Sequence, residues 1–210
     1  MISLDGVLFS YDGAAPVLQI PALDVQAGLT LVLGPNGSGK STLLRIVAGV
    51  DRPTHGTVRI CGVDLWRDEV AGRRQLAYVP EHPELTPYAT IMEVLQLVAR
   101  LRGLPPTAVA EALDRVGLVE VAWRTVRELS MGQRRRALLA AALLGEPRVV
   151  ILDEPLETMD AAMRVLVREW VLARRSAGAA VLLATHDREP FAGNVDRVLK
   201  MSGGMIVSGG

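Results

Sequence analysis

One short segment limits the possible folds of this chain more than any other. Residues 34–41 read Gly-Pro-Asn-Gly-Ser-Gly-Lys-Ser, which fits the pattern G-x-x-x-x-G-K-[ST]. An apolar run over residues 29–33, interrupted only by Thr30, precedes this segment, and apolar residues at helical spacing follow it. A strand, a glycine-rich loop and a helix in this order open an α/β unit whose loop surrounds a phosphate group. The segment therefore predicts an α/β fold with a P-loop that binds nucleotide phosphates.

Each residue type in this loop has a chemical role. Glycines let backbone N–H groups turn toward an anion without steric conflict. Lys40 supplies a compact cation to the β- and γ-phosphates, and the hydroxyl of Ser41 is a ligand for Mg²⁺. The expected nucleotide contacts are Gly34, Pro35, Asn36, Gly37, Ser38, Gly39, Lys40, Ser41 and Thr42.

A pair of carboxylates supports the same chemistry. Residues 149–152 form an apolar run that ends in Asp153 and Glu154, as in a Walker B strand. A carboxylate at the end of a strand beside a phosphate loop holds Mg²⁺, so we expect Asp153 to be a metal ligand. Glu154 is the expected general base, because a carboxylate at this point can polarise an attacking water.

The remaining pattern predicts the organisation of the chain. Short strand patterns occupy the first thirty residues and residues 53–65, and further strands are expected at 76–79, 149–152 and 179–184. Residues 90–145 have helical patterns, and Thr90 with Glu93 has the form of a capping box. Residues 195–201 and 205–208 read as a hairpin.

We therefore expect one domain over residues 1–210. Its α/β core, of the P-loop NTPase type with a mixed, mainly parallel sheet, takes residues 1–85 and 146–210, including an N-terminal antiparallel β subdomain. An α-helical subdomain is inserted over about 86–145.

Composition excludes several function classes. The chain has 23 Lys+Arg and 23 Asp+Glu, so binding of nucleic acid through bulk positive charge is not expected. Its longest apolar run, residues 137–144, is far shorter than the roughly 20 residues that span a bilayer. The first residues show no signal peptide pattern, so we expect a cytoplasmic chain without direct membrane insertion.

Several motifs in order resemble those of ABC ATPases. Residues 129–133, Leu-Ser-Met-Gly-Gln, resemble the LSGGQ signature, and the 88 residues between Ser41 and Ser130 match the usual gap. Residues 157–160 resemble the D-loop, which ends in Asp160. His186 occupies the switch-histidine position, and Tyr11 stands where the family has an aromatic residue that stacks on adenine. The resemblance covers essentially the whole chain.

The resemblance implies an ATPase that uses ATP and Mg²⁺. Glu154, His186 and Lys40 are then the catalytic residues, and Glu81 at the Q-loop position joins Ser41 and Asp153 as a metal ligand. The family further implies a head-to-tail homodimer or pseudo-dimer, in which the signature binds the γ-phosphate held by the other subunit. The residues that this adds to the nucleotide site are Tyr11, Glu81, Ser130, Gly132, Gln133 and Asp160.

The family also implies a separate integral membrane permease, which holds the ATPase at the inner face of the cell membrane. Pro80-Glu81 and the helix that follows resemble ATPases of drug, antibiotic or polysaccharide exporters, so we expect an exporter. A haem-exporter-type ATPase and a soluble ABC-type ATPase without a transport role are the alternatives.

Two residues depart from the usual family motifs, and two further segments bear on the surface of the chain. Met131 replaces the first glycine of the signature, and Glu81 replaces the usual glutamine. Residues 133–136, Gln-Arg-Arg-Arg, are expected on the exposed face of the signature helix. The apolar side chains that either pack internally or form a groove for the permease are Leu85, Tyr88, Met92, Leu97 and Leu104.

Overall fold

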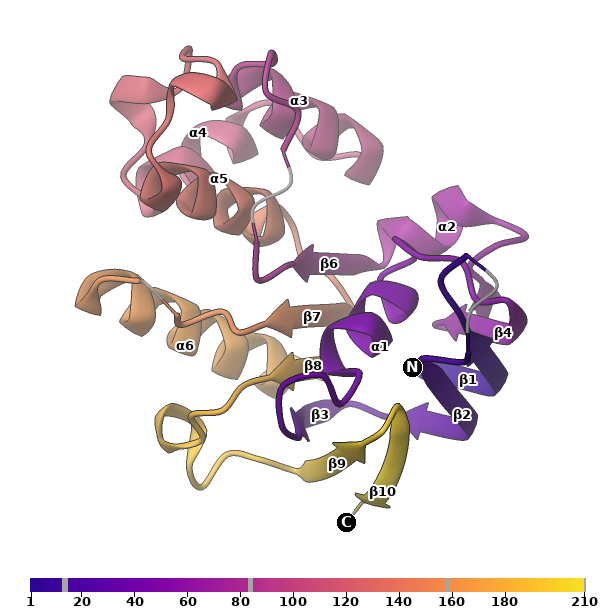
Figure 1. Cartoon of the computed structure of the whole chain (residues 1–210). Coiled ribbons are helices and arrows are strands. Elements are labelled where there is room, and N and C mark those ends of the chain that lie inside the picture. Colours follow the sequence, from indigo (N-terminus) through magenta and orange to yellow (C-terminus); the bar gives the residue numbers. More distant parts are fainter. Residues whose placement is uncertain (13–14, 83–84, 158, 210) are drawn as a thin grey trace.

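The computed structural model describes residues 1–12, 15–82, 85–157 and 159–209. Two sheets and a group of helices make up this part of the chain (Figure 1). The larger sheet has six strands in the order β10-β9-β3-β8-β7-β6, and the smaller has four in the order β2-β1-β4-β5. The larger sheet begins beside the helical group at β6 and ends at the C-terminal hairpin (Figure 1).

The larger sheet is the mixed, mainly parallel sheet that the sequence predicts. Neighbouring strands from β9 to β6 pair in parallel, and β10 pairs with β9 in the antiparallel direction. Strands β7 and β8 are buried along their whole length, as expected when helices or another sheet cover both faces. The six strands are β3 (Gly28–Leu33), β6 (Leu76–Val79), β7 (Val149–Asp153), β8 (Ala180–Ala184), β9 (Arg197–Ser202) and β10 (Met205–Gly209).

The smaller sheet is the predicted antiparallel subdomain. Its strands are β1 (Ile2–Phe9), β2 (Leu18–Val25), β4 (His55–Ile60) and β5 (Val63–Asp64). Helix α1 (Lys40–Val47) shares one hydrophobic cluster with this sheet and with one face of the larger sheet. The start of α1 is thereby fixed at the edge where β3 ends.

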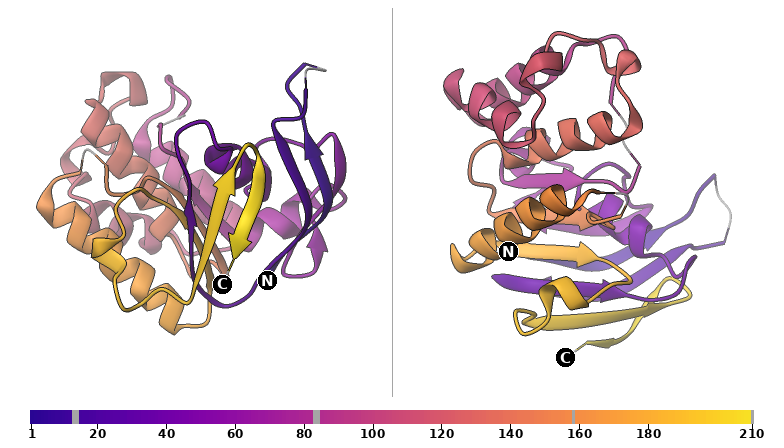
Figure 2. Two further views of the ribbon diagram at one scale, coloured as in Figure 1. Left: turned by 60° about the horizontal axis from the view of Figure 1, so that its bottom comes forward. Right: turned by 90° about the vertical axis from the view of Figure 1, so that its left-hand side faces the viewer.

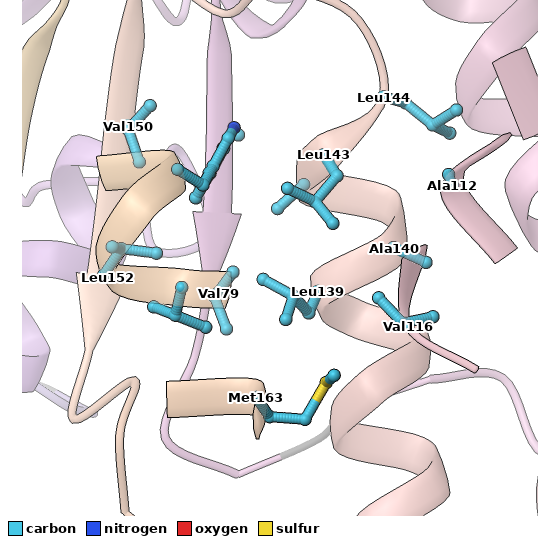
Figure 3. Close-up of a cluster of buried hydrophobic side chains, with 14 of the residues drawn as sticks. Val79, Ala112, Val116, Leu139, Ala140, Leu143, Leu144, Val150, Leu152 and Met163 are labelled. Atoms are coloured by element: carbon cyan, nitrogen blue, oxygen red, sulfur yellow. The ribbon is translucent and has the colours of Figure 1, made fainter. Parts of the chain in front are cut away.

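Helices cover the other face of the larger sheet. Helix α6 (Ala161–Ser176) and a helical group lie there, and Figure 2 shows that group at the opposite end of the molecule from the antiparallel sheet. Leu139 and Leu143 of the signature helix pack beside Val79, Val150 and Leu152 of the sheet (Figure 3). The helical group comprises α3 (Ile91–Arg102), α4 (Thr107–Arg115), α5 (Met131–Leu143) and the 3₁₀ turns Val119–Val121 and Val126–Glu128.

Local hydrogen bonding accounts for the helix starts. Thr90 and Glu93 close the predicted capping box of α3, and Asp160 accepts a hydrogen bond from Met163 N–H at the start of α6. Glu189–Phe191 forms a 3₁₀ turn after β8. Helix α2 (Glu69–Arg74) was not predicted, because its six residues are too few to show a helical period.

The structure corrects one expectation about exposure and decides another that the sequence left open. Arg135, predicted on an exposed helix face, is only 7% exposed. Leu85, Met92 and Leu104 pack against the hydrophobic core, whereas Tyr88 and Leu97 are exposed. The apolar residues predicted as one group therefore divide between the interior and the surface.

Candidate functional site

A pocket of about 650 Å³ opens where the parallel strands end. The loop after β3, the carboxylates after β7 and the histidine after β8 meet there, because parallel strands present their carboxyl ends at one edge. The residues that line it are Val17, Asn36, Gly37, Gly39, Lys40, Ser41, Thr42, Glu81, Asp153, Glu154, Glu157 and His186. The structure thus brings the P-loop and both predicted carboxylates into one site.

The P-loop has a conformation that requires glycine. Gly37 and Gly39 have φ angles of +77° and +97°, in the region that side chains disfavour. A Cβ atom on Gly34 would lie 2.5 Å from both the hydroxyl of Ser38 and the carbonyl oxygen of Met201. The loop therefore follows its tight path because three positions lack side chains.

Lys40 is held over the loop by backbone oxygens. Its Nζ donates hydrogen bonds to the carbonyl oxygens of Gly34, at 2.8 Å, and of Pro35, at 3.1 Å. Helix α1 begins at Lys40, so its positive N-terminal end and the ammonium group both face the same pocket. An anion in this pocket meets two sources of positive charge.

Asp153 has the properties of a metal ligand. It is 2% exposed, and its Oδ1 atom is buried with no hydrogen-bond partner in the described part of the chain. Burial raises the pKa of this carboxyl, a hydrogen bond from Ser41 opposes the rise, and the charges of Glu81 and Glu154 add to it. An unpartnered carboxylate oxygen beside a hydroxyl and a second carboxylate is an oxygen donor set that suits a hard cation such as Mg²⁺.

Glu154 and His186 lie side by side in the same pocket. His186 Nδ1 is 3.1 Å from Glu154 Oε2 and 3.7 Å from Glu157 Oε1. Glu154 has a φ angle of +44°, so its backbone lies in the left-handed region. The two expected catalytic side chains are therefore in contact with each other and close to the P-loop.

The predicted signature residues line a different pocket, of about 260 Å³. Ser130 caps α5 by accepting a hydrogen bond from Gln133 N–H, and the Gln133 side chain accepts one from Ser130 N–H. Arg136 pairs with Asp160 at 2.5 Å, which joins α5 to the start of α6. The residues that line this signature pocket are Ser130, Gly132, Gln133, Arg135, Arg136, Met159, Asp160 and Met163.

Met131 fits this arrangement without strain. It is the first residue of α5, and it is not among the non-glycine residues with positive φ in the described part of the chain. The backbone N–H groups of Met131 and Gly132 therefore remain at a helix start, where anions bind favourably.

The predicted site residues thus form two groups. The P-loop, Glu81, Asp153, Glu154 and His186 belong to the large pocket, and Ser130, Gly132, Gln133 and Asp160 belong to the signature pocket. Gly34, Pro35 and Ser38 shape the loop behind the pocket surface. Both groups lie in one chain without sharing a pocket.

Tyr11 lines neither the large pocket nor the signature pocket. It is 48% exposed and packs edge-to-face on Phe9 with ring centroids 4.7 Å apart. Its role against adenine stays a prediction. Sequence reasoning missed Val17, which carries no motif signal, and Glu157, which was noted only as part of the D-loop.

The fold and these two sites define the class of ATP-binding cassettes. Residues 18–157 of this chain match the sequence model of the family described as "ABC transporter". The chain belongs to the ABC transporter family, whose ATP-binding proteins are ATPases.

Individual relatives are named as import proteins. The chain is 37% identical to the Fe(3+) ions import ATP-binding protein FbpC 2 of Rhodococcus jostii (strain RHA1), over 98% of this chain and 60% of that protein. It is 35% identical to the sulfate/thiosulfate import ATP-binding protein CysA 1 of Agrobacterium fabrum (strain C58 / ATCC 33970), over 98% of this chain and 62% of that protein. The chain thus spans about three fifths of the length of these relatives. The expected exporter type finds no support in these names.

Solved structures show the same fold. One described as an ATP-binding subunit of an ABC transporter has a TM-score of 0.88 and 26% identity. The match covers the whole of this chain and 89% of the solved chain. A dimeric bacterial ABC transporter cassette has a TM-score of 0.85 and 25% identity, and it covers the whole of this chain and 98% of its own.

Proposed function

We propose that this chain binds MgATP in the large pocket and hydrolyses it to drive transport through a separate membrane permease. The observation that carries the proposal is the meeting in one pocket of the P-loop, of Asp153 with its unpartnered Oδ1 atom, and of the Glu154–His186 pair. These groups supply phosphate binding, a metal ligand and a base, which phosphoryl transfer to water requires.

The residues divide the chemistry among them. Lys40 and the P-loop N–H groups hold the β- and γ-phosphates. Ser41, Asp153 and Glu81 would hold Mg²⁺, which would neutralise phosphate charge. Water bonds to the γ-phosphorus as the bond to the β–γ bridging oxygen breaks, and Glu154 accepts the water proton. His186, beside Glu154, contacts the γ-phosphate and keeps the carboxylate in place.

A second copy of the chain completes the site in this proposal. Ser130 and the N-terminus of α5 form an anion site, yet they line a pocket separate from the P-loop of the same chain. In a head-to-tail dimer the signature pocket of one copy faces the nucleotide of the other. A solved cassette with which this chain shares its fold is described as dimeric, which supports the pairing of two copies.

We assign the permease to an exposed groove that is lined by both apolar and charged residues. A hollow of about 320 Å³ lies between α2 and α3, and Val70 and Leu101 on its lining are 58% and 52% exposed. No described helix is long and apolar enough to cross a membrane. In this proposal the permease holds the chain at the inner face of the membrane through this groove.

Steady-state hydrolysis tests the enzymatic part of the proposal. We expect Mg²⁺-dependent release of phosphate from ATP, and we expect Glu154→Gln to bind MgATP while losing about 10²-fold or more in turnover, because it lacks the base. Unchanged turnover in Glu154→Gln would remove Glu154 as the base. Absence of Mg²⁺-dependent hydrolysis in the wild-type chain would overturn the assignment.

Co-purification in mild detergent tests the transport part. We expect a protein with several membrane spans to accompany the wild-type chain, and Leu101→Glu to lose it, because a charge in the groove must be desolvated. Val119→Glu, which places the same charge at an exposed residue outside this groove, is the matched control. A chain that hydrolyses ATP with no such partner would be the soluble ABC-type ATPase.

We propose import as the direction of transport, in place of the exporter expected from Pro80-Glu81. The names of the relatives with 35% and 37% identity support import. In vesicles that contain the purified complex, labelled sulfate or Fe(3+) should move toward the compartment that holds ATP. Movement of the label away from that compartment would indicate export, and the haem-exporter alternative predicts the same outward movement for labelled haem.

A further inference from the structure

A buried arginine connects the signature helix to the proposed catalytic base. Arg135 is 7% exposed, and its guanidinium donates a hydrogen bond of 2.8 Å to the carbonyl oxygen of Glu154, 19 residues away. Burying a guanidinium is costly unless hydrogen bonds compensate, so this position is expensive to maintain for packing alone. The contact therefore indicates that Arg135 has a role in the nucleotide site, which it reaches at Glu154.

We propose that Arg135 is a positioning residue that fixes the backbone of Glu154 from the signature helix. The inference rests on the proposed function, because it requires Glu154 to act as the base. Arg135 does not touch the nucleotide pocket in this scheme. It acts through the peptide group that carries the Glu154 side chain.

The backbone of Glu154 has a conformation that needs external support. Its φ of +44° is disfavoured for a residue with a side chain. Its N–H donates to the carbonyl oxygen of Ala184 at 3.0 Å, and its carbonyl accepts from Arg135. A hydrogen bond on each side of the residue therefore holds the direction in which the carboxylate leaves the backbone.

The direction matters because Glu154 meets its partners at short range. Its Oε2 accepts a long hydrogen bond of 3.4 Å from His186 N–H and lies 3.1 Å from His186 Nδ1. Without the Arg135 bond, the Glu154 carbonyl keeps one hydrogen bond fewer in a buried setting and the peptide is free to turn. A displacement of the base by about 1 Å can lower a rate about 10²-fold.

Arg135 also belongs to the signature pocket. It lines that pocket together with Ser130 and Gly132, which lie in the first turn of the same helix or just before it. One side chain thus reaches from a pocket assigned to the partner's nucleotide to the base that serves the chain's own nucleotide. A shift of α5 is transmitted directly to the Glu154 peptide.

Enzyme kinetics of matched variants test this inference. We expect Arg135→Met, which keeps the side-chain volume and removes the donor, to lower kcat for ATP about 10- to 100-fold with KM within about threefold of wild type. Arg135→Lys, which keeps a cation and a donor, should recover part of kcat. Arg197→Met is the control, because it removes a guanidinium bond to the carbonyl of Asp24 far from the site.

A double variant separates positioning from general destabilisation. Because Arg135 acts through Glu154, adding Arg135→Met to Glu154→Gln should cause no further loss of turnover, whereas independent effects would multiply. A circular-dichroism melting curve of each variant shows whether the protein is folded at the assay temperature. If Arg135→Met does not fold, the same comparison is made with Arg135→Leu, which also lacks a hydrogen-bond donor.

The outcomes distinguish the inference from the proposed function. Wild-type ATPase activity that depends on Glu154, with an unchanged kcat in folded Arg135→Met or Arg135→Leu, would overturn the role of Arg135 alone. A multiplied loss in the double variant, or an effect confined to KM, would do the same. A wild-type chain without Glu154-dependent activity would overturn the proposed function and this inference with it.

Discussion

At the scale of single residues, Asp153 is the group of the site whose surroundings disfavour its charged form. Burial raises the pKa of the Asp153 carboxyl, and the neighbouring acids Glu81 and Glu154 raise it further. Relative to the unfolded chain, the folded chain therefore favours the neutral form of Asp153. The stability that this provides is complete below the ordinary aspartate pKa and is lost as pH rises through the raised value.

Neutralising Asp153 should stabilise the metal-free chain at neutral pH. Asp153→Asn keeps the shape and removes the buried charge, so we expect its melting temperature without nucleotide to exceed that of wild type, by a margin that shrinks as pH falls. Added MgATP should then stabilise it less than wild type. Calorimetric melts from pH 4 to pH 8 measure both effects.

Asp196 is the opposite control for this experiment. Its pKa is lowered by hydrogen bonds from Arg175 and then from Leu29 N–H, so Asp196→Asn should destabilise the chain at neutral pH. A lower melting temperature for metal-free Asp153→Asn at neutral pH would contradict the assignment of Asp153 as an uncompensated buried charge.

Even a conservative substitution of Lys40 is expected to weaken ATP binding. Its ammonium is held by the carbonyls of Gly34 and Pro35 in a tight loop, where a planar guanidinium does not occupy the same space. We expect Lys40→Arg to weaken ATP binding about tenfold or more by titration calorimetry. Lys200→Arg, at the exposed second lysine of the chain, should bind as wild type does. Equal affinities of Lys40→Arg and wild type would contradict the steric argument.

At the scale of elements, local signals in the sequence predict the parts well. The strands around the P-loop and the capped starts of α3 and α6 follow from apolar runs and from cap chemistry within a few residues. The burial of Arg135 could not be predicted, because its partner is a backbone carbonyl at Glu154, and no sequence pattern reports a backbone partner.

The start of α5 should be more important for hydrolysis than for folding. Ser130→Arg removes the cap and places a cation in the signature pocket, so we expect loss of hydrolysis with ATP binding to the monomer retained. Thr125→Ala is the matched control, because Thr125 closes a similar capping box with Glu128 outside either pocket. It should lose about 1 kcal/mol of stability and keep its turnover. Normal hydrolysis by Ser130→Arg would show that the signature pocket serves no nucleotide.

At the scale of the whole molecule, the topology rather than any motif assembles the site. Four segments, which follow β3, β6, β7 and β8, meet because these strands run parallel in one sheet. The sequence predicts this meeting, since each motif follows an apolar run. It does not predict that the signature residues occupy a second pocket, because that separation depends on where the helical group packs on the sheet (Figure 2).

The central claim is that each nucleotide site needs two copies of the chain. Lys40→Ala removes the P-loop cation and Ser130→Arg blocks the signature pocket, so each variant alone should lack ATPase activity. Random pairing in an equal mixture makes half of the dimers hybrids with one intact site each, so about a quarter of wild-type activity should return. The double variant Lys40→Ala/Ser130→Arg, mixed with either single variant, has no intact site and is the control.

Phosphate release from this mixture is the most direct measurement of the claim. Recovery in the mixture of the two single variants, and not in the controls, is the result that we predict. A mixture that forms dimers yet stays as inactive as its components would contradict a site shared between two chains.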